Sequence, residues 1–313
     1  AQIYCAALFL LQNDFEYPLL PLWIFLIIMC GRFFAVYVNK IIIYALTLLS
    51  SFLGILLCSA SLFKLDYSLE QNFEFIRINN FSIPVGIYID KISLIVALVL
   101  FSVSFLVQAF SINYMKDEAK QYRFYAFLNM FNFSMAGLLF SPNLFQMYFF
   151  WELVGVMSYL LIGFDYKKTI KSESSRRVFL MNRFGDTALI TSILATSYFM
   201  FNYAGNPNFV SLNFEDFNAI SIILSAYTST PLFYVICILF IIGAAVKSAQ
   251  FPFFTWLQEA MEAKLPVSAL LHSATMVVAG AYLLIRLLPF FTLAPNLLNI
   301  IITLGLLTAL ICS

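Results

Sequence analysis

The sequence predicts an all-α polytopic membrane protein. Of its 313 residues, 62% are hydrophobic and only 11% are charged, and the mean hydropathy is +0.92. Ordinary soluble domains carry about 25% charged residues, so the composition excludes a soluble enzyme and a disordered chain. The 17 Lys and Arg residues balance the 16 Asp and Glu residues, which leaves no excess positive charge to attract nucleic acid. We therefore expect membrane lipids, and no nucleic acid, around the chain.

The apolar residues are gathered in stretches long enough to cross a bilayer. A spanning helix needs about 20 mostly apolar residues, and its backbone polar groups must be paired within the segment. We find nine such windows and expect a transmembrane helix in each. They cover residues 18–31, 41–63, 91–114, 122–141, 143–164, 178–202, 231–255, 266–288 and 296–313.

The loops between these windows predict an orientation and a hairpin. When the loops are assigned alternately to two sides, most Lys and Arg residues fall on one of them, the Lys/Arg-rich side. Such loops stay in the cytoplasm or matrix, so the N-terminus is expected on the opposite, outer side. Residues 73–90 lie in an outer loop, and their alternating pattern around Asn79-Asn80 predicts a short β-hairpin.

Few charged side chains lie inside the windows, and each is costly there. A charge at mid-bilayer costs at least about 2.5–3.5 kcal/mol. Glu152 is the only charged residue in the stretch 147–164. An interfacial carboxylate beside Trp151 is one interpretation, and a buried carboxylate that faces other helices is the one that we favour.

Lys247 lies directly after the apolar run 237–246, and Pro252 follows five residues later. Proline removes a backbone donor and clashes with the carbonyl four residues before it, so we predict a broken helix next to the lysine. Broken membrane helices are tolerated where they line protein or a hydrated cavity. Snorkelling of the lysine to the interface is the alternative, but the polar neighbours Ser248 and Gln250 favour a hydrated interior.

Three further residues complete a set of groups that could move protons. His272 is the single histidine. Imidazole binds and releases protons near neutral pH, although a packing role beside Ser and Thr is the alternative. Arg183 and Asp186 lie one turn apart on one helix face and could form an ion pair or a gate. The sequence shows no nucleophile triad, phosphate loop or metal cluster, so these groups indicate proton or cation movement.

Four motifs, in order along the chain, resemble NADH dehydrogenase subunit 5, the antiporter-like proton-pumping membrane chain of respiratory complex I. The motifs are FWELVGVMSYLLIGF at 150–164, NRFGD at 182–186, GAAVKSAQFPFFTWL at 243–257 and PVSALLHSATMVVAG at 266–280. Residues 21–32 also look like the first helix of that family. The resemblance covers about residues 18–313.

The resemblance implies a domain organisation and a proton relay. Residues 122–290 would form a first antiporter-like repeat with a proton half-channel, preceded by two helices (1–63), the outer loop (64–90) and a third helix (91–121). Within the repeat, Lys247 would be the central proton carrier and Glu152 its ionic partner. His272 would pass the proton laterally, while Arg183 and Asp186 would gate the route.

The resemblance also implies partners. These are the other membrane-arm subunits of complex I, with flavin and iron–sulfur clusters expected only in partner subunits and no cofactor in this chain. Subunit 5 normally continues beyond Ser313, so we expect a split subunit, in which 291–313 begins a second repeat and a second chain supplies the C-terminal half.

The sequence departs from the family pattern at two internal points. Residues 263–265 replace a link that is usually small and rich in Gly and Pro, and they include Lys264. Glu259 stands where the family has Asp. Both changes fall between the last two quoted motifs.

Two other functions fit the same residues. The helices are also similar to the large subunits of multisubunit Na⁺/H⁺ antiporters, and no residue separates proton from sodium. A scaffold without transport would leave Glu152 and Lys247 dispensable.

The 36 Phe and 17 Tyr residues are typical of A/T-rich, often organellar genomes. With the family, they lead us to expect the mitochondrial inner membrane, with the N-terminus towards the intermembrane space.

Overall fold

The protein folds as a multi-pass helical membrane protein. The computed structural model describes residues 40–64, 68–78, 81–118, 120–203, 210–228, 230–273 and 275–312. Within this part, five segments are long and apolar enough to cross a membrane: Ile43–Phe63, Lys91–Tyr114, Leu144–Asp165, Thr169–Asn202 and Leu265–Arg286. The count of nine spans stays a prediction, and the first window, 18–31, lies outside the described residues.

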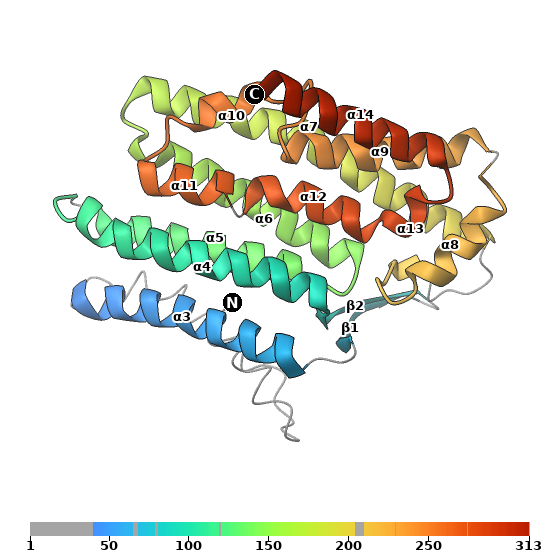
Figure 1. The fold of residues 1–313 in the computed structure, drawn as a ribbon, viewed down its shortest axis with the longest axis horizontal. Coiled ribbons are helices and arrows are strands. Elements are labelled where there is room, and N and C mark those ends of the chain that lie inside the picture. The colour runs from blue at the N-terminus through green and yellow to red at the C-terminus, as the bar shows by residue number, and fades with distance from the viewer. Residues whose placement is uncertain are drawn as a thin grey trace.

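The helices lie roughly side by side in an elongated bundle (Figure 1). The first group comprises α3 (Lys40–Lys64), α4 (Lys91–Tyr114), α5 (Gln121–Leu139), α6 (Leu144–Ile162), the 3₁₀ turn η1 (Gly163–Asp165) and α7 (Thr169–Tyr203). The second group comprises α8 (Phe217–Ser225), α9 (Pro231–Lys247), α10 (Thr255–Ala260), α11 (Leu265–Ser273), α12 (Met276–Arg286), α13 (Leu288–Phe291) and α14 (Pro295–Cys312). In the centre, α7 packs on α6 and α9, and α9 also packs on α12.

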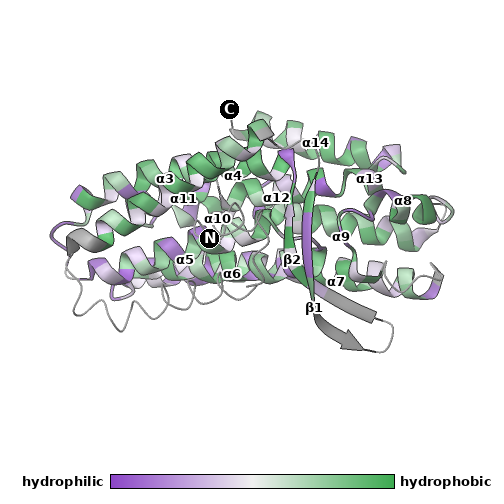
Figure 2. Cartoon of the chain, turned by 90° about the horizontal axis from the view of Figure 1, so that it is seen from below, coloured by the Kyte–Doolittle hydropathy of each residue, from purple (hydrophilic) through white to green (hydrophobic). Residues whose placement is uncertain are grey.

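Hydrophobic residues predominate along most of the helices (Figure 2), and many large apolar side chains are exposed on the surface of the bundle. Leu106 on α4 is 67% exposed, Tyr198 on α7 is 70% exposed and Leu310 on α14 is 76% exposed. Such surfaces are unfavourable in water and ordinary in lipid, where apolar side chains lose nothing by exposure. The pattern therefore supports a bundle surrounded by membrane.

Two antiparallel strands occupy the segment in which the hairpin is predicted. β1 (Leu69–Ile78) pairs with β2 (Phe81–Ile89) from Leu69 opposite Ile89 to Ile78 opposite Phe81. The Gln146 side chain joins β2 to α6, because it accepts from Gly86 N and donates to Gly86 O, both at 2.9 Å. The turn residues 79–80 lie outside the described part, and the side of the membrane stays a prediction.

Glu70 on β1 gives this strand pair a dependence on pH. Burial, followed by a hydrogen bond with the Glu215 carboxyl, raises the pKa of Glu70 from 4.5 to about 7. Because the folded state holds this proton more tightly, the contribution to stability is complete below about pH 4.5 and is lost as the pH rises through about 7. We expect hydrogen–deuterium exchange in β1 to be faster at about pH 8 than at about pH 5, after correction for intrinsic rates.

Replacement of Glu70 by glutamine provides the control for this prediction. Glutamine keeps a hydrogen-bond donor towards Glu215 and cannot ionise, so the pH dependence of exchange in β1 should flatten. Equal corrected exchange in the original protein at both pH values would contradict the assignment.

Next to the strands, Arg286 joins the end of α12 to the start of α4. Its two terminal nitrogens each donate to a different oxygen of Asp90 at 2.8 Å, and Nε donates to the Tyr282 hydroxyl at 2.9 Å. Asp90 also caps α4, because its carboxylate accepts from Ser93 N at 2.8 Å. The guanidinium lies 5.2 Å from the centre of the Tyr88 ring of β2. One buried arginine thus connects α12, α4 and β2.

Candidate functional site

The predicted helix break lies directly after Lys247. α9 ends at this residue, and the chain resumes a helix only at Thr255. Two groups satisfy carbonyls that the break leaves free: Gln250 N donates to Ala245 O at 2.9 Å, and Trp256 Nε1 donates to Val246 O at 2.8 Å. The lysine therefore stands at the end of a helix whose interruption is held in place by a tryptophan.

Lys247 is buried among three helices, with its side chain 1% exposed. Its Nζ lies 3.5 Å from Asp186 Oδ1 on α7 and donates to Trp151 O on α6 at 3.4 Å. Trp151 Nε1 donates to the same Asp186 oxygen at 2.7 Å, and the ammonium lies 5.2 Å from the centre of the Trp151 ring. A Cβ at Gly155 would lie 3.4 Å from Nζ, so the glycine leaves room for the ammonium group. The result is a buried ion pair in which both charges have further partners.

Glu152 does not contact Lys247 in this structure, which corrects the pairing that the resemblance implies. Glu152 forms an ion pair with Arg183 and accepts a hydrogen bond from the Tyr148 hydroxyl at 2.5 Å. Nor does Arg183 pair with Asp186. Adjacent residues of a helix project about 100° apart, so Trp151 faces the interior while Glu152 shares the side of α6 that carries Tyr148. The two carboxylates and two cations are all brought together, but in exchanged pairs.

His272 lies near the helix break but does not reach Lys247 directly. Its ring centre is 6.4 Å from that of Trp256. Both of its ring nitrogens are buried, and neither has a hydrogen-bond partner among the described residues. In the same part of the chain, the Ser248 and Ser268 hydroxyls are also buried without a partner. Water is the usual partner for polar groups left in this state.

The sequence did not predict several members of this site. The window 266–288 is divided into α11 and α12, and Thr275 Oγ1 donates to Leu270 O at 2.7 Å at this division. Trp151 donates to the Asp186 carboxylate that pairs with Lys247, and Trp256 donates to the backbone carbonyl of Val246, the residue before Lys247. Both tryptophans are in the quoted motifs, and an indole N–H inside an apolar window is the signal that could have identified them.

Glycines bring the helices close together around Lys247. A Cβ at Gly185 of α7 would lie 2.6 Å from Val246 Cβ on α9, and one at Gly243 would lie 3.0 Å from Leu189 Cβ on α7. A Cβ at Gly280 of α12 would overlap Ala244 O on α9 and Ser248 Oγ directly after α9. The position of α9 relative to both neighbours therefore depends on small residues, as is common for packed membrane helices.

Gly280→Ala is expected to destabilise the bundle by about 1–3 kcal/mol, the usual cost of overpacking. The added methyl group meets a backbone carbonyl, which cannot rotate away, so α9 and α12 must separate. The midpoint of thermal unfolding in detergent should fall. Gly305→Ala is the matched control, because a Cβ there meets nothing within 4 Å. Equal midpoints for the two variants would show that α9 and α12 are not in close contact.

Lys264, which departs from the family pattern, holds the link between α10 and α11. Its side chain is 9% exposed, forms an ion pair with Glu118 after α4 and lies 3.6 Å from Asp165 of η1. Asp165 also pairs with Lys171 of α7 at 3.3 Å. The buried Lys264 thus joins this link by ion pairs to two neighbouring segments, the one after α4 and the turn η1.

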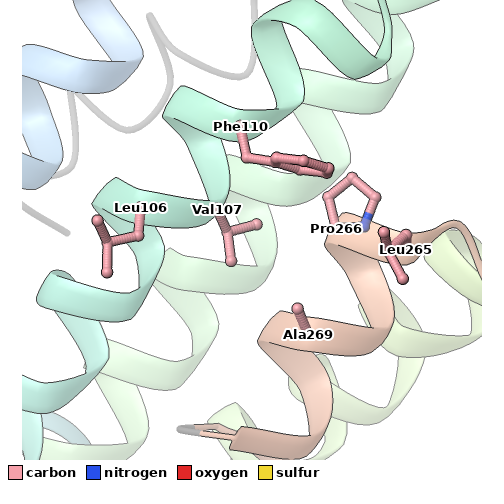
Figure 3. A pocket seen from close by; sticks show the side chains of 6 residues that line it. All are labelled: Leu106, Val107, Phe110, Leu265, Pro266 and Ala269. Carbon is pink, nitrogen blue, oxygen red and sulfur yellow. The ribbon is translucent and has the colours of Figure 1, made fainter.

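An apolar groove lies between α4 and α11 (Figure 3). The residues that line it are Leu106, Val107, Phe110, Leu265, Pro266 and Ala269. None of these side chains can ionise, so this groove offers apolar surface and contributes nothing to a route for protons.

Comparisons with known proteins agree with this architecture. A family model described as NADH:quinone oxidoreductase/Mrp antiporter, TM, matches residues 141–313. A second, described as NADH-Ubiquinone oxidoreductase (complex I), chain 5 N-terminus, matches residues 75–125.

Curated relatives include the chloroplastic NAD(P)H-quinone oxidoreductase subunit 5 of two plants. The Lobularia maritima protein is 40% identical over 83% of this chain and 35% of its own length. The Nasturtium officinale protein is 37% identical over 96% of this chain and 41% of its own length. The chain thus spans less than half of either relative. Because both relatives are chloroplastic, the mitochondrial inner membrane stays a prediction.

Two solved assemblies contain chains with a similar fold. The structure of the Mrp complex from Dietzia sp. DQ12-45-1b matches with a TM-score of 0.64 and 24% identity, over 75% of this chain and 24% of that chain. The membrane-bound sulfane sulfur reductase, an archaeal respiratory membrane complex, matches with a TM-score of 0.70 and 19% identity, over 88% of this chain and 53% of that chain. These likenesses concern the fold alone. By its family match over residues 141–313, the chain belongs to the NADH:quinone oxidoreductase/Mrp antiporter family of transmembrane proteins.

Proposed function

We propose that this chain is part of a proton-translocating membrane subunit of an NADH–quinone oxidoreductase, and that protons pass through Lys247. The observation that carries the proposal is the buried Lys247–Asp186 ion pair beside a helix break. A buried ammonium group is stable only while a carboxylate compensates its charge. A change in the distance between the two groups therefore changes the affinity of Lys247 for its proton.

The exchanged ion pairs suggest how this distance could change. Asp186 pairs with Lys247, the position that the resemblance implies for Glu152. Glu152 pairs instead with Arg183, which lies one turn before Asp186 on α7. Redox chemistry in a partner subunit would shift these carboxylates, release the proton of Lys247 and allow His272 to pass it laterally. Moving one charge across about 100 mV requires about 2.3 kcal/mol, which a change of about two pKa units would supply.

Partner subunits complete the proposed pump. Flavin and iron–sulfur clusters would reside in other subunits of the complex. A second chain with the remainder of a subunit-5-like protein would cover α14, on which six large apolar side chains are exposed. They are Ile300, Ile302, Leu306, Leu307, Leu310 and Ile311.

A Na⁺/H⁺ exchanger is the second candidate, because the fold also matches a chain of the Dietzia Mrp complex. The same buried ion pair could couple a proton to a sodium ion. In that case, transport would require sodium and would proceed without NADH.

The test begins with gentle solubilisation of the native membranes and a native gel. We expect the chain to migrate in a large assembly that oxidises NADH and contains a second chain with the missing repeat. Vesicles from the same membranes should then acidify or alkalinise on addition of NADH without a requirement for sodium. Migration with small antiporter-type subunits, together with a sodium-dependent proton flux in the absence of NADH, would overturn the proposal in favour of the exchanger.

A further inference from the structure

Glu259 on α10 has one carboxylate oxygen near the surface and one inside the protein. Oε1 lies 3.4 Å from Arg177 of α7, and the side chain is 34% exposed. Oε2 is buried and has no hydrogen-bond partner among the described residues. An unpaired buried carboxylate oxygen is costly unless it binds water or a proton. The Glu259 carboxylate therefore presents Oε1 to the aqueous surface of the Lys/Arg-rich side and Oε2 to the interior of the protein.

Ser268 and His272, two other residues with buried polar atoms that lack a hydrogen-bond partner in the described part of the chain, lie on α11, the next helix along the chain. Trp256 lies one turn before Glu259 on α10 and contacts the His272 ring of α11. Ser268 lies one turn before His272, towards the same link between the helices. This link is compact, because Met261, Glu262 and Ala263 each donate a backbone hydrogen bond three residues back, to Gln258, Glu259 and Ala260. The Trp256–His272 contact and the short link therefore join α10, which carries Glu259, to α11, which carries Ser268 and His272.

We propose that Glu259 takes up protons from the Lys/Arg-rich side and delivers them, through Ser268 and bound water, to His272. This proposal rests on the function proposed for Lys247. The Glu259 carboxylate accepts a proton from water and becomes neutral. It then releases the proton to a water chain, and the His272 imidazole accepts it as the carboxylate is restored. Once the earlier proton of Lys247 has left through His272, the imidazole passes the new proton to the neutral lysine through bound water.

The charges around Glu259 suit reversible proton uptake. Arg177 of α7 pairs with the Glu259 carboxylate, and on the same helix Glu173 Oε2 lies 3.9 Å from Arg177 Nη2. Glu262 and Lys264 lie in the link on the same side. Arg177 is 65% exposed, so water weakens its attraction for the carboxylate.

The proposal is tested in the assembled complex, in membrane vesicles that oxidise NADH. Glu259→Gln should reduce the rate of NADH-driven proton translocation several-fold. The loss should grow as the pH on the Lys/Arg-rich side rises, because a carboxylate that collects protons matters most when protons are scarce. Glu259→Asp, the residue found in the family pattern, should restore the rate. Glu262→Gln changes an exposed carboxylate of the same link and should have no effect.

Two further variants separate proton uptake from a structural ion pair. Arg177→Gln breaks the same pair but leaves the carboxylate, so it should retain translocation. Ser268→Ala leaves the pair intact and removes the next polar group, so it should slow translocation, and it carries the test if Glu259→Gln fails to assemble. Unchanged translocation in assembled Glu259→Gln overturns the proposal. A pH-independent loss shared by Glu259→Gln and Arg177→Gln also overturns it. Lys247→Met, measured alongside, distinguishes the two proposals: normal translocation overturns both, whereas its loss together with a normal Glu259→Gln overturns only this one.

Discussion

Lys247→Met is expected to abolish the proton translocation that is coupled to this part of the complex. Methionine fills a similar volume but carries no proton, and it leaves Asp186 without its cation in a site where the carboxylate side chain is 4% exposed. NADH oxidation should continue at a reduced rate or become uncoupled, since no redox group is expected in this chain. The measurement is the number of protons translocated per NADH oxidised in sealed vesicles.

Lys247→Arg distinguishes a proton carrier from a structural cation. Arginine keeps the positive charge beside Asp186 but does not release its proton in proteins. If Lys247 carries protons, this variant should assemble normally and still fail to translocate. Lys168→Met, which changes an exposed lysine, should behave like the original protein. Normal translocation with either replacement at position 247 would reject the assignment and favour the scaffold interpretation.

Arg286→Met is expected to produce the largest loss of stability, about 3–5 kcal/mol, the cost of leaving a buried charge without its partner. The Arg286 and Asp90 side chains are 7% and 17% exposed, and methionine replaces only the aliphatic part of the arginine. Burial raises the pKa of Asp90, but the hydrogen bonds and charge of Arg286 outweigh it, so the pKa stays below 3.8. The pair therefore stabilises the fold at pH values above about 4 and loses this contribution on further acidification.

The comparison with Arg177→Met tests whether burial is the cause. Arg177 forms two ion pairs, but it is 65% exposed, so its loss should cost no more than about 1 kcal/mol. Thermal unfolding in detergent measures both variants. The double variant Arg286→Met/Asp90→Asn should recover part of the lost stability, because it removes the unpaired carboxylate. Similar midpoints for the two single variants would show that Arg286 contributes no more than a surface arginine.

Helix positions could be predicted from the sequence wherever one apolar window corresponds to one helix. The windows 41–63, 91–114 and 143–164 differ from α3, α4 and α6 by two residues at most. α7 begins at Thr169, nine residues before its window, because the polar start of a helix that extends beyond the bilayer carries no hydropathy signal. The division between α11 and α12 was missed because Thr275 can end a helix by hydrogen bonding without a proline or glycine to announce it.

The members of the site could be predicted, whereas their pairing could not. Because a charged side chain inside a bilayer is energetically costly, the few charged residues in the apolar windows are candidates for a functional site. Four of them, Glu152, Asp186, Arg183 and Lys247, lie together in the structure. Which carboxylate meets which cation depends on the rotation of α6 against α7. That rotation is fixed by tertiary contacts, such as the bond from Trp151 to Asp186. Spacing within one helix favoured the pair Arg183–Asp186, and the packing of three helices determined otherwise.

The length of α7 has a mechanical consequence. Its 35 residues span about 52 Å at 1.5 Å per residue, which exceeds the hydrocarbon thickness of about 30 Å. Arg177 pairs with Glu259, and Asp186 pairs with Lys247. Both Arg177 and Asp186 belong to this one helix, about 13 Å apart along its axis. If a neighbouring subunit tilted α7 by a force on one end, the exposed ion pair Arg177–Glu259 and the buried ion pair Lys247–Asp186 would be displaced in the same movement.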